Sequence, residues 1–460
     1  MPPSLALIVW LVLLFGLLYF DPANMRGTSS ALWVPVIWMF FIGSRQPAQW
    51  VGGQAISAAE AFQEGNPLDR SVLTLLIVIA IGVLASRSFQ WGRFFAQNQA
   101  LVVLLAFAMV SALWSDFPFV AIKRWFRDFG NYLMILVVLS DPLPLEAVKA
   151  LLRRLAYLLI PLSIVLVKYF LYLAVHYDPW TGRAEYVGAA TSKNMLGVMC
   201  LVSGIFFFWD TVTRWAQRKE PRTKRILAVN FAFLGMVLWL LNLSNSATSR
   251  VCLLLGCMVI LVASSKWGKR GPVLLKALIP LGFCLYLVLW YGLDLQGLLA
   301  SQVGRDPTLT GRTEIWKAVL SLHTNWLLGT GYESFWLGPR LNYLWPLTGQ
   351  VNEAHNGYLE VYLTLGIVGV ILLGIFMIAS YRTICRKLGP EFGIAPLALS
   401  LWTVSLYYNM TESAAFNGQL FWVIFLLVTI GVYAAKPMAE NAVSANRSEL
   451  QPALRAVQIS

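Results

Sequence analysis

The chain has 460 residues, of which 58% are hydrophobic and only 12% are charged, and its formal net charge is +13. Soluble domains carry about 25% charged residues, so this composition excludes a soluble globular protein. Cytoplasmic loops of a membrane protein account for an excess of Lys and Arg, so nucleic acid is not an expected partner.

Apolar stretches long enough to cross a bilayer recur along the chain and predict thirteen membrane spans, or twelve because the first two are short. The predicted spans are 4–20, 30–43, 71–86, 98–114, 128–140, 150–175, 190–209, 227–243, 247–264, 272–292, 357–380, 393–409 and 415–435. The predicted fold class is therefore an all-α polytopic membrane protein. One membrane domain covers residues 1–435, and we expect the polar tail 436–460 to be cytoplasmic and disordered.

The distribution of Lys and Arg predicts the orientation of these spans. Basic residues concentrate in the connections 211–225, 265–276 and 381–389, which fall on one side of the membrane, and this side is cytoplasmic by the positive-inside rule. The longest outer loop, 293–356, is too long for a simple connection. Within it, Arg312–His323 predicts an amphipathic helix that lies on the membrane surface or packs on the membrane helices.

Several basic residues lie on the outer side, where the positive-inside rule disfavours them. A single Arg at a helix end usually snorkels or pairs with a carboxylate, but several on one face suit an anionic ligand such as a diphosphate. Lys168, inside a predicted span, either has a function or snorkels to the outer interface. The outer basic residues are Lys123, Arg124, Arg127, Arg183, Lys193, Arg250 and Arg312.

His355 lies at the outer mouth of the predicted span 357–380, two residues after Glu353. Gly366 follows eleven residues later, which is three helical turns plus about 20°, so we expect both residues on one stripe of a single helix. A small residue there lets a second helix approach closely. The five cysteines lie in or beside apolar segments without ligand-like spacing, so we expect no metal site, and no cofactor motif is present.

Short motifs along the chain resemble those of the bacterial O-antigen ligase and polysaccharide polymerase superfamily, which includes an exopolysaccharide polymerase branch. The most specific is His355-Asn356, then nine residues, then Gly366-Ile-Val-Gly369. The others, in chain order, are Gly65–Arg70, Ser111–Pro118 with Arg124, Lys193-Asn194-Met-Leu-Gly197, Arg250-Val-Cys-Leu-Leu254, Gly311-Arg312-Thr-Glu-Ile-Trp316 and Gly329-Thr-Gly331.

The resemblance implies an enzyme of the bacterial inner membrane with a fold similar to the GT-C class of glycosyltransferases. Such enzymes take a glycan from a polyprenyl diphosphate carrier at the periplasmic face. They pass it to an acceptor sugar, to lipid A core or, in some relatives, to a protein hydroxyl, with inversion and without a metal. Two other classes stay open: a transporter or flippase for lipid-linked sugars, and a non-catalytic subunit of a polysaccharide-export machine.

The same resemblance assigns roles to individual residues. We expect Arg250 and Arg312 to hold the donor diphosphate, and His355 to act as a general base or as a further phosphate contact. Glu353 is a rival base. Lys193 and Arg124 are expected as secondary phosphate contacts, while Asn194 and Asn356 orient donor or acceptor; Trp336, Tyr343 and Trp345 either stack on sugars or pack.

Overall fold

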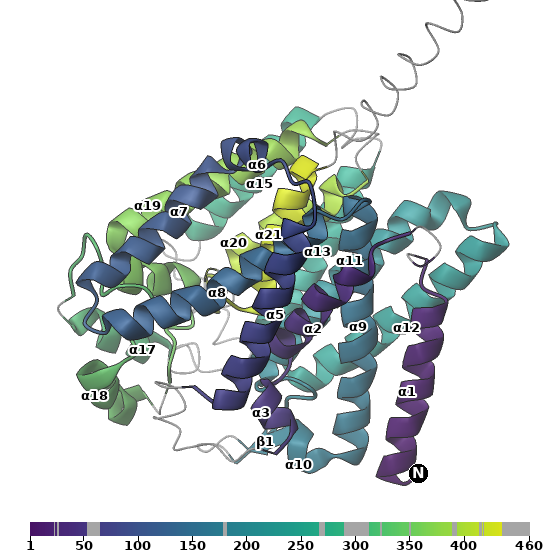
Figure 1. Ribbon diagram of the computed structural model, residues 1–460, viewed down its shortest axis with the longest axis horizontal. Coiled ribbons are helices and arrows are strands. Elements are labelled where there is room, and N and C mark those ends of the chain that lie inside the picture. Colours follow the sequence, from purple (N-terminus) through teal and green to yellow (C-terminus); the bar gives the residue numbers. More distant parts are fainter. Residues whose placement is uncertain are drawn as a thin grey trace, which may run out of the picture.

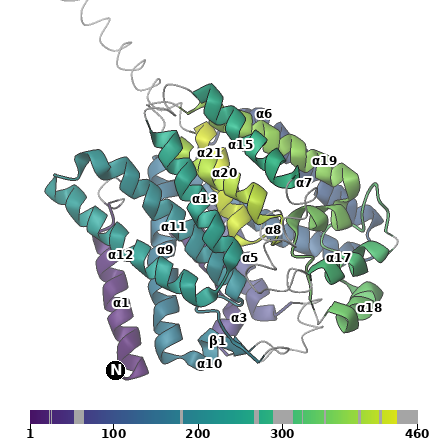
Figure 2. The same cartoon turned by 180° about the vertical axis from the view of Figure 1, so that it is seen from behind.

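The computed structural model is built almost entirely from helices (Figures 1 and 2). It describes residues 1–22, 24, 27–52, 65–177, 182–265, 272–288, 312–322, 324–348, 351–388, 393–413, 416 and 418–434. The tail 436–460, the first part of the long outer loop and Gly311 lie outside the described residues. Within the described part, the predicted all-α membrane fold is confirmed.

Helices occupy most of the described part of each predicted span. Those of the first half are α1 (Pro3–Tyr19), η2 (Ser30–Leu32), α2 (Trp33–Gly43), α3 (Pro47–Trp50), α5 (Pro67–Ala85), α6 (Trp91–Gln97), α7 (Gln99–Val110), η3 (Ser111–Trp114), α8 (Pro118–Leu139), α9 (Pro144–Tyr169) and α10 (Leu171–Ala174). Those of the second half are α11 (Lys193–Arg214), η4 (Trp215–Gln217), α12 (Pro221–Ser244), α13 (Ala247–Ser264), α15 (Pro272–Leu287), α17 (Arg312–Ser321), α18 (Gly338–Thr348), α19 (Gly357–Arg386), α20 (Ala395–Tyr408) and α21 (Leu420–Ala434).

Six of these helices are long and apolar enough to cross a membrane: α5, α9, α11, α12, α13 and α19. The pair α6 and α7 passes the same test together but is bent by 89°, and four further apolar stretches are shorter. The chain is thus a multi-pass protein, and the predicted count of twelve or thirteen spans stays a prediction. In Figure 1, α3, α10 and β1 lie at the same end as the N-terminus, and α6 lies at the opposite end.

Two predicted outer loops contain regular structure. Residues 115–127 were predicted as a loop, but α8 begins at Pro118, because proline at the first helical position has the backbone angle that a helix start requires. The three cations in that segment therefore lie on a helix and not in a loop. The outer connection between the predicted spans 150–175 and 190–209 contains a hairpin of β1 (Val175–Tyr177) and β2 (Ala184–Tyr186), paired antiparallel with His176 opposite Glu185.

A buried charge cluster fastens the segment after α1 to the centre of the bundle. The Asp21 carboxylate is fully buried and accepts from Arg153 at 3.1 Å and from Arg154 at 2.8 Å, and both arginines belong to α9. Asp210 of α11 lies 3.7 Å from the other side of Arg153 and accepts from Arg214. Buried charges need such partners, because an unpaired charge in a low dielectric is costly.

The expected stripe of His355 and Gly366 on one helix is wrong. His355 precedes α19 and has a left-handed φ of 49°, and Gly366 breaks the helix with φ 65° and ψ −167°. The amides of Ile367 and Val368, freed by this break, donate to the carbonyls of Trp326 and Leu327 at 3.0 and 3.3 Å. A side chain at Gly366 would collide with that backbone, so the glycine permits close approach of a loop and not of a second helix.

The loop that enters the break contains the predicted Gly329-Thr-Gly331 motif. Thr330 and Gly331 donate their amides to the carbonyls of Leu363 and Thr364 at 3.1 and 2.9 Å, just before the break. Two motifs that the sequence presents separately therefore form one backbone junction. This junction fixes the outer loop to the start of α19.

Candidate active site

The helix α17 confirms the predicted amphipathic helix in the outer loop, although it ends at Ser321. Its buried residues Ile315 and Val319 pack with Leu341 and Leu344 of α18 and with Leu363 of α19. The helix therefore packs on another outer helix and on the top of a long apolar helix, which is the second of the two predicted alternatives. This packing turns Arg312 and Trp316, one helical turn apart, toward the start of α19.

Trp316 and Glu360 hold the turn that carries His355. The indole Nε1 of Trp316 donates to the carbonyl of Ala354 at 2.7 Å, and the amide of Ala354 donates to Glu360. Trp336 donates to both oxygens of the same carboxylate at 3.1 Å. Ala354 is thus held through both its amide and its carbonyl, which fixes the backbone that leads into the left-handed His355.

Asn356, predicted to orient a substrate, caps α19. Its amide oxygen accepts from the backbone of Tyr358 and Leu359 at 3.1 Å, which is the usual role of Asn at this position. Its own backbone amide donates to Ser413 at 3.1 Å. The side chain positions the helix start and His355, its neighbour in sequence.

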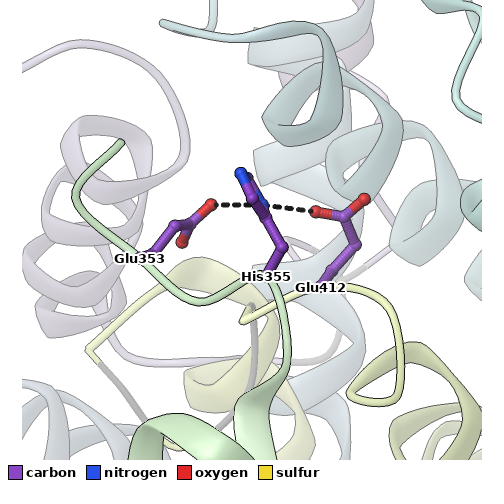
Figure 3. Close-up of side chains that lie close together, drawn as sticks. All are labelled: Glu353, His355 and Glu412. Carbon is purple, nitrogen blue, oxygen red and sulfur yellow. Dashed lines mark ion pairs between the residues drawn. The ribbon is translucent and has the colours of Figure 1, made fainter. Parts of the chain in front are cut away.

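Three predicted site residues meet at one carboxylate that was not predicted. Arg312 donates to Oε1 of the buried Glu412 at 2.6 Å, and Asn194 donates to Oε2 at 3.0 Å. His355 Nδ1 lies 3.5 Å from Oε2 of Glu412 and 3.0 Å from Oε1 of Glu353, so the imidazole is placed between two carboxylates (Figure 3). We call these five residues the Glu412 cluster.

The electrostatics of the Glu412 cluster favour a protonated imidazole. Burial alone lowers the pKa of His355, but the carboxylates of Glu353 and Glu412 outweigh it and raise this pKa to about 10. Burial likewise raises the pKa of Glu353, and its ion pair with His355 overcomes this effect and holds the pKa below its ordinary value. At neutral pH, His355 is therefore a cation and Glu353 an anion. A protonated imidazole binds anions and cannot accept a proton.

Glu353, His355 and Glu412 each offer a ligand atom, and these atoms lie within 4.8 Å of one another, a spacing that a metal ion could bridge. Both oxygens of Glu412, however, already accept hydrogen bonds from Arg312 and Asn194. A guanidinium 2.6 Å from the carboxylate also repels a second cation. The arrangement is better explained as an ion-pair network.

A cavity of about 830 Å³ opens beside this cluster, a size typical of ligand sites. Asn194, Glu353 and Glu412 form part of its wall. The lining also includes basic residues from the start of α5 and from α8, namely Arg70, Lys123, Arg124 and Arg127. Cations and carboxylates thus share one cavity, which suits a phosphate-bearing ligand and a proton acceptor together.

The structure places the remaining predicted residues outside the Glu412 cluster. Arg250 donates to the carbonyl of Asn242 at 3.2 Å and to Asn245 at 3.0 Å, so its guanidinium lies at the end of α12. Lys193 pairs with Glu185 of β2. Lys168 lies over the ring of Trp239, with its ammonium 5.6 Å from the ring centroid.

The three aromatic residues that were expected either to stack on sugars or to pack differ in their burial and in their partners. Trp336 is buried and also lines the cavity, where it holds Glu360. Trp345 donates to Asn352 at 2.9 Å, and Tyr343 is 54% exposed. Only Trp336 is therefore placed to meet a ligand in the cavity.

Glu412 was not predicted from the sequence, because only the basic residues of the outer side were considered as site residues. It lies in the predicted outer connection 410–414, between two apolar spans, where an acidic residue needs a partner as much as a basic one does. Pairing the outer carboxylates with the outer cations could have found it. The separation of Arg312 and Glu412 along the sequence does not indicate that the two side chains pair.

Comparisons with known proteins give a family match and a relative. The model of the O-antigen ligase family matches residues 231–374, which include Arg312, Glu353 and His355. The exopolysaccharide production protein ExoQ of Rhizobium meliloti (strain 1021) is 24% identical over 321 residues, which cover 63% of this chain and 68% of the relative.

Residues 231–374 of this chain thus match the O-antigen ligase family, and the chain is similar to a protein of exopolysaccharide production. The predicted resemblance is thus confirmed, and with it a ligase- or polymerase-type function of a membrane protein in glycan assembly. The matched region ends before Glu412. The carboxylate on which the family motifs converge comes from a later part of the chain.

Proposed function

We propose that this protein is a glycosyltransferase that moves a glycan from a polyprenyl diphosphate carrier to an acceptor sugar at the periplasmic face of the bacterial inner membrane. One observation carries the proposal: Arg312 and His355, from two separate family motifs, converge on Glu412, and Glu412 itself lines a large cavity together with several basic residues. Arginine and imidazolium donors suit the oxygens of a diphosphate.

The reaction is a single displacement with inversion. The acceptor hydroxyl oxygen attacks the anomeric carbon of the donor glycan while the bond from that carbon to the diphosphate oxygen breaks. The diphosphate leaves with the bonding electrons and stays on the carrier, and a base of the protein takes the hydroxyl proton. Cationic side chains that bind the departing oxygens stabilise the charge that forms there.

In this mechanism His355 is a diphosphate contact and not the base. Its Nδ1 faces two carboxylates, so Nε2–H is the donor left for a ligand. Arg312 is the second donor, and Glu412 holds both cations in place. Charge neutralisation by these groups makes the reaction independent of a metal ion.

We further propose that the acceptor is a growing polysaccharide, because the relative ExoQ is named for exopolysaccharide production. A ligase that transfers to lipid A core and a protein oligosaccharyltransferase would use the same donor. A ligase and a protein oligosaccharyltransferase differ from a polymerase in the product that they form. The experiment below identifies that product.

The test removes the gene from its host and restores it as wild type, Arg312→Ala, His355→Ala or, as a control, Glu314→Gln, whose side chain is exposed on α17. Extracted glycans are separated on a gel, and membrane levels of each protein are checked by blot. We expect wild type and the control to restore long glycan, and both site variants to leave single repeat units at normal protein level. Long chains that stay on the carrier would indicate a ligase. Normal glycan in both site variants would contradict the proposal.

A further inference from the structure

The loop between α17 and α18 is fixed to η3 and α8 by a series of hydrogen bonds. Trp114 donates to the carbonyl of Leu328 at 3.1 Å, and the amide of Tyr332 donates to Ser111 at 2.9 Å. The hydroxyls of Ser115 and Ser334 lie 2.7 Å apart. Arg124, predicted as a phosphate contact, donates to the backbone carbonyl of Glu333 at 2.7 Å. The motif over Ser111–Pro118 together with Arg124 therefore serves to hold this loop.

The residue held in this way is Glu333, which has a left-handed φ of 47°. Residues other than glycine rarely adopt this conformation unless the surroundings impose it, and such positions gather at functional sites. The side chain lines the large cavity and is 23% exposed. The fold thus accepts a strained backbone in order to present a carboxylate to the cavity.

Most other carboxylates of the cavity are engaged by two or more groups. Glu353 faces His355, Glu412 accepts from Arg312 and Asn194, and Glu360 accepts from Trp336 and from a backbone amide. Asp128 accepts from Arg127 and Tyr332, and Asp69 accepts from the amide of Ala48.

Glu333 differs from Glu412, Glu360 and Asp128, each of which accepts hydrogen bonds from two groups. Within the described part of the chain, its carboxylate has one side-chain partner, Arg127, at 3.2 Å from Oε2. Its other oxygen can therefore accept a proton from a ligand in the cavity.

The surroundings also make Glu333 a stronger base than an ordinary carboxylate. Burial raises its pKa, the negative charge of Asp128 adds to this, and Arg127 and Arg124 oppose it without cancelling it. The charged and titratable groups around it are Arg124, Arg127 and Asp128 of α8, Tyr332 beside it and Glu360 of α19.

We propose that Glu333 is the general base that takes the proton from the acceptor hydroxyl as its oxygen bonds to the anomeric carbon of the donor. This inference rests on the proposed function and names the group that the reaction requires. The proton moves to the Glu333 carboxylate, the electron pair of the broken bond leaves with the carrier diphosphate, and the proton is later lost to water. Arg127 keeps the carboxylate ionised and oriented before the step.

The first test measures release of polyprenyl diphosphate from lipid-linked repeat units of the host, with the full-length protein in lipid vesicles from pH 5 to 9. We expect Glu333→Gln to lower the rate about 100-fold or more, and to remove the acidic limb of the pH profile. Glu314→Gln serves as a matched exposed control and should behave as wild type. A Glu333→Gln variant that keeps more than about a tenth of the rate, or the wild-type pH profile, would overturn the proposal.

The second test separates a base from a mere partner of Arg127. Glu333→Gly suits the left-handed backbone and leaves room for a small carboxylate, so added formate should restore part of the rate. Formate should not act on Arg127→Gln. Equal losses in Glu333→Gly, Arg127→Gln and the double variant, without formate rescue, would assign Glu333 a structural role and contradict the proposal. If the wild-type protein releases no carrier diphosphate, the proposed function itself fails. If Glu333→Gln is active and Arg312→Ala is inactive, only the role of Glu333 as the base is refuted.

Discussion

The protonation state of His355 is the most quantitative prediction of the site. A pKa raised from 6.5 to about 10 means that the folded protein favours the imidazolium by about 5 kcal/mol. Because the folded pKa lies above the unfolded one, this stabilisation is complete below about pH 6.5 and is lost as the pH rises through about 10. The nearer carboxylate, Glu353 at 3.0 Å, and Glu412 at 3.5 Å share this effect.

The titration can be followed by NMR of the ¹⁵N-histidine-labelled protein in lipid nanodiscs. The chain has three histidines, so the variant with His176→Gln and His323→Gln leaves His355 as the reporter. We expect a midpoint near 10, a fall of about one to two pH units in Glu412→Gln, and a midpoint at or below 6.5 when Glu353 is also replaced by Gln. A midpoint at or below 6.5 in the parent with both carboxylates intact would refute the electrostatic reasoning and restore His355 as a candidate base.

Three further outcomes follow from the fold. Gly366→Ala should abolish folded protein at the membrane because its left-handed backbone has no room for a side chain, whereas Gly374→Ala, where the added carbon meets nothing within 4 Å, should be tolerated; the two are compared by blot and size-exclusion profile. Asp21→Asn should destabilise the protein by about 3–5 kcal/mol, seen as a lower thermal midpoint in detergent, since it leaves two buried arginines without their carboxylate. Trp316→Phe should cost about 1 kcal/mol and reduce transfer activity, since the carbonyl of Ala354 loses its donor; an unchanged rate would mean that the His355 turn does not depend on it.

Features that depend on local pattern were predictable from the sequence. Runs of apolar residues gave the positions of the membrane helices, and helical spacing gave α17 with its buried face at Ile315 and Val319. The motifs around Arg312 and His355 identified two residues that share the partner Glu412. Each of these signals lies within a short stretch, where periodicity and turn chemistry determine the structure.

Features that depend on contacts between distant segments could not be predicted. Nothing near Gly366 indicates that the carbonyls of Trp326 and Leu327 would satisfy the amides freed by its break. A straight helix was the simpler prediction. It wrongly placed His355 on the same helix as Gly366, whereas His355 lies in the turn before α19. Glu333 is an ordinary acidic residue in the sequence, and only the fold brings it to the cavity wall.

The same limit applies to Arg250 and Lys193. Both lie at helix starts on the predicted outer side, as an anion site would require, yet their nearest partners are the end of α12 and Glu185. Position along the chain could not distinguish a cation that caps a neighbouring helix from one that faces a ligand.

The central claim is that the protein breaks the bond between glycan and carrier. The most direct measurement places the purified protein in vesicles with polyprenyl-diphosphate-linked repeat units, in the presence of a metal chelator, and follows free polyprenyl diphosphate and glycan length together. We predict that the two rise in step, with one diphosphate released for each repeat unit added, and that neither rises with Arg312→Ala. Movement of intact lipid-linked glycan across the vesicle membrane without release of diphosphate would contradict the account and indicate a transporter.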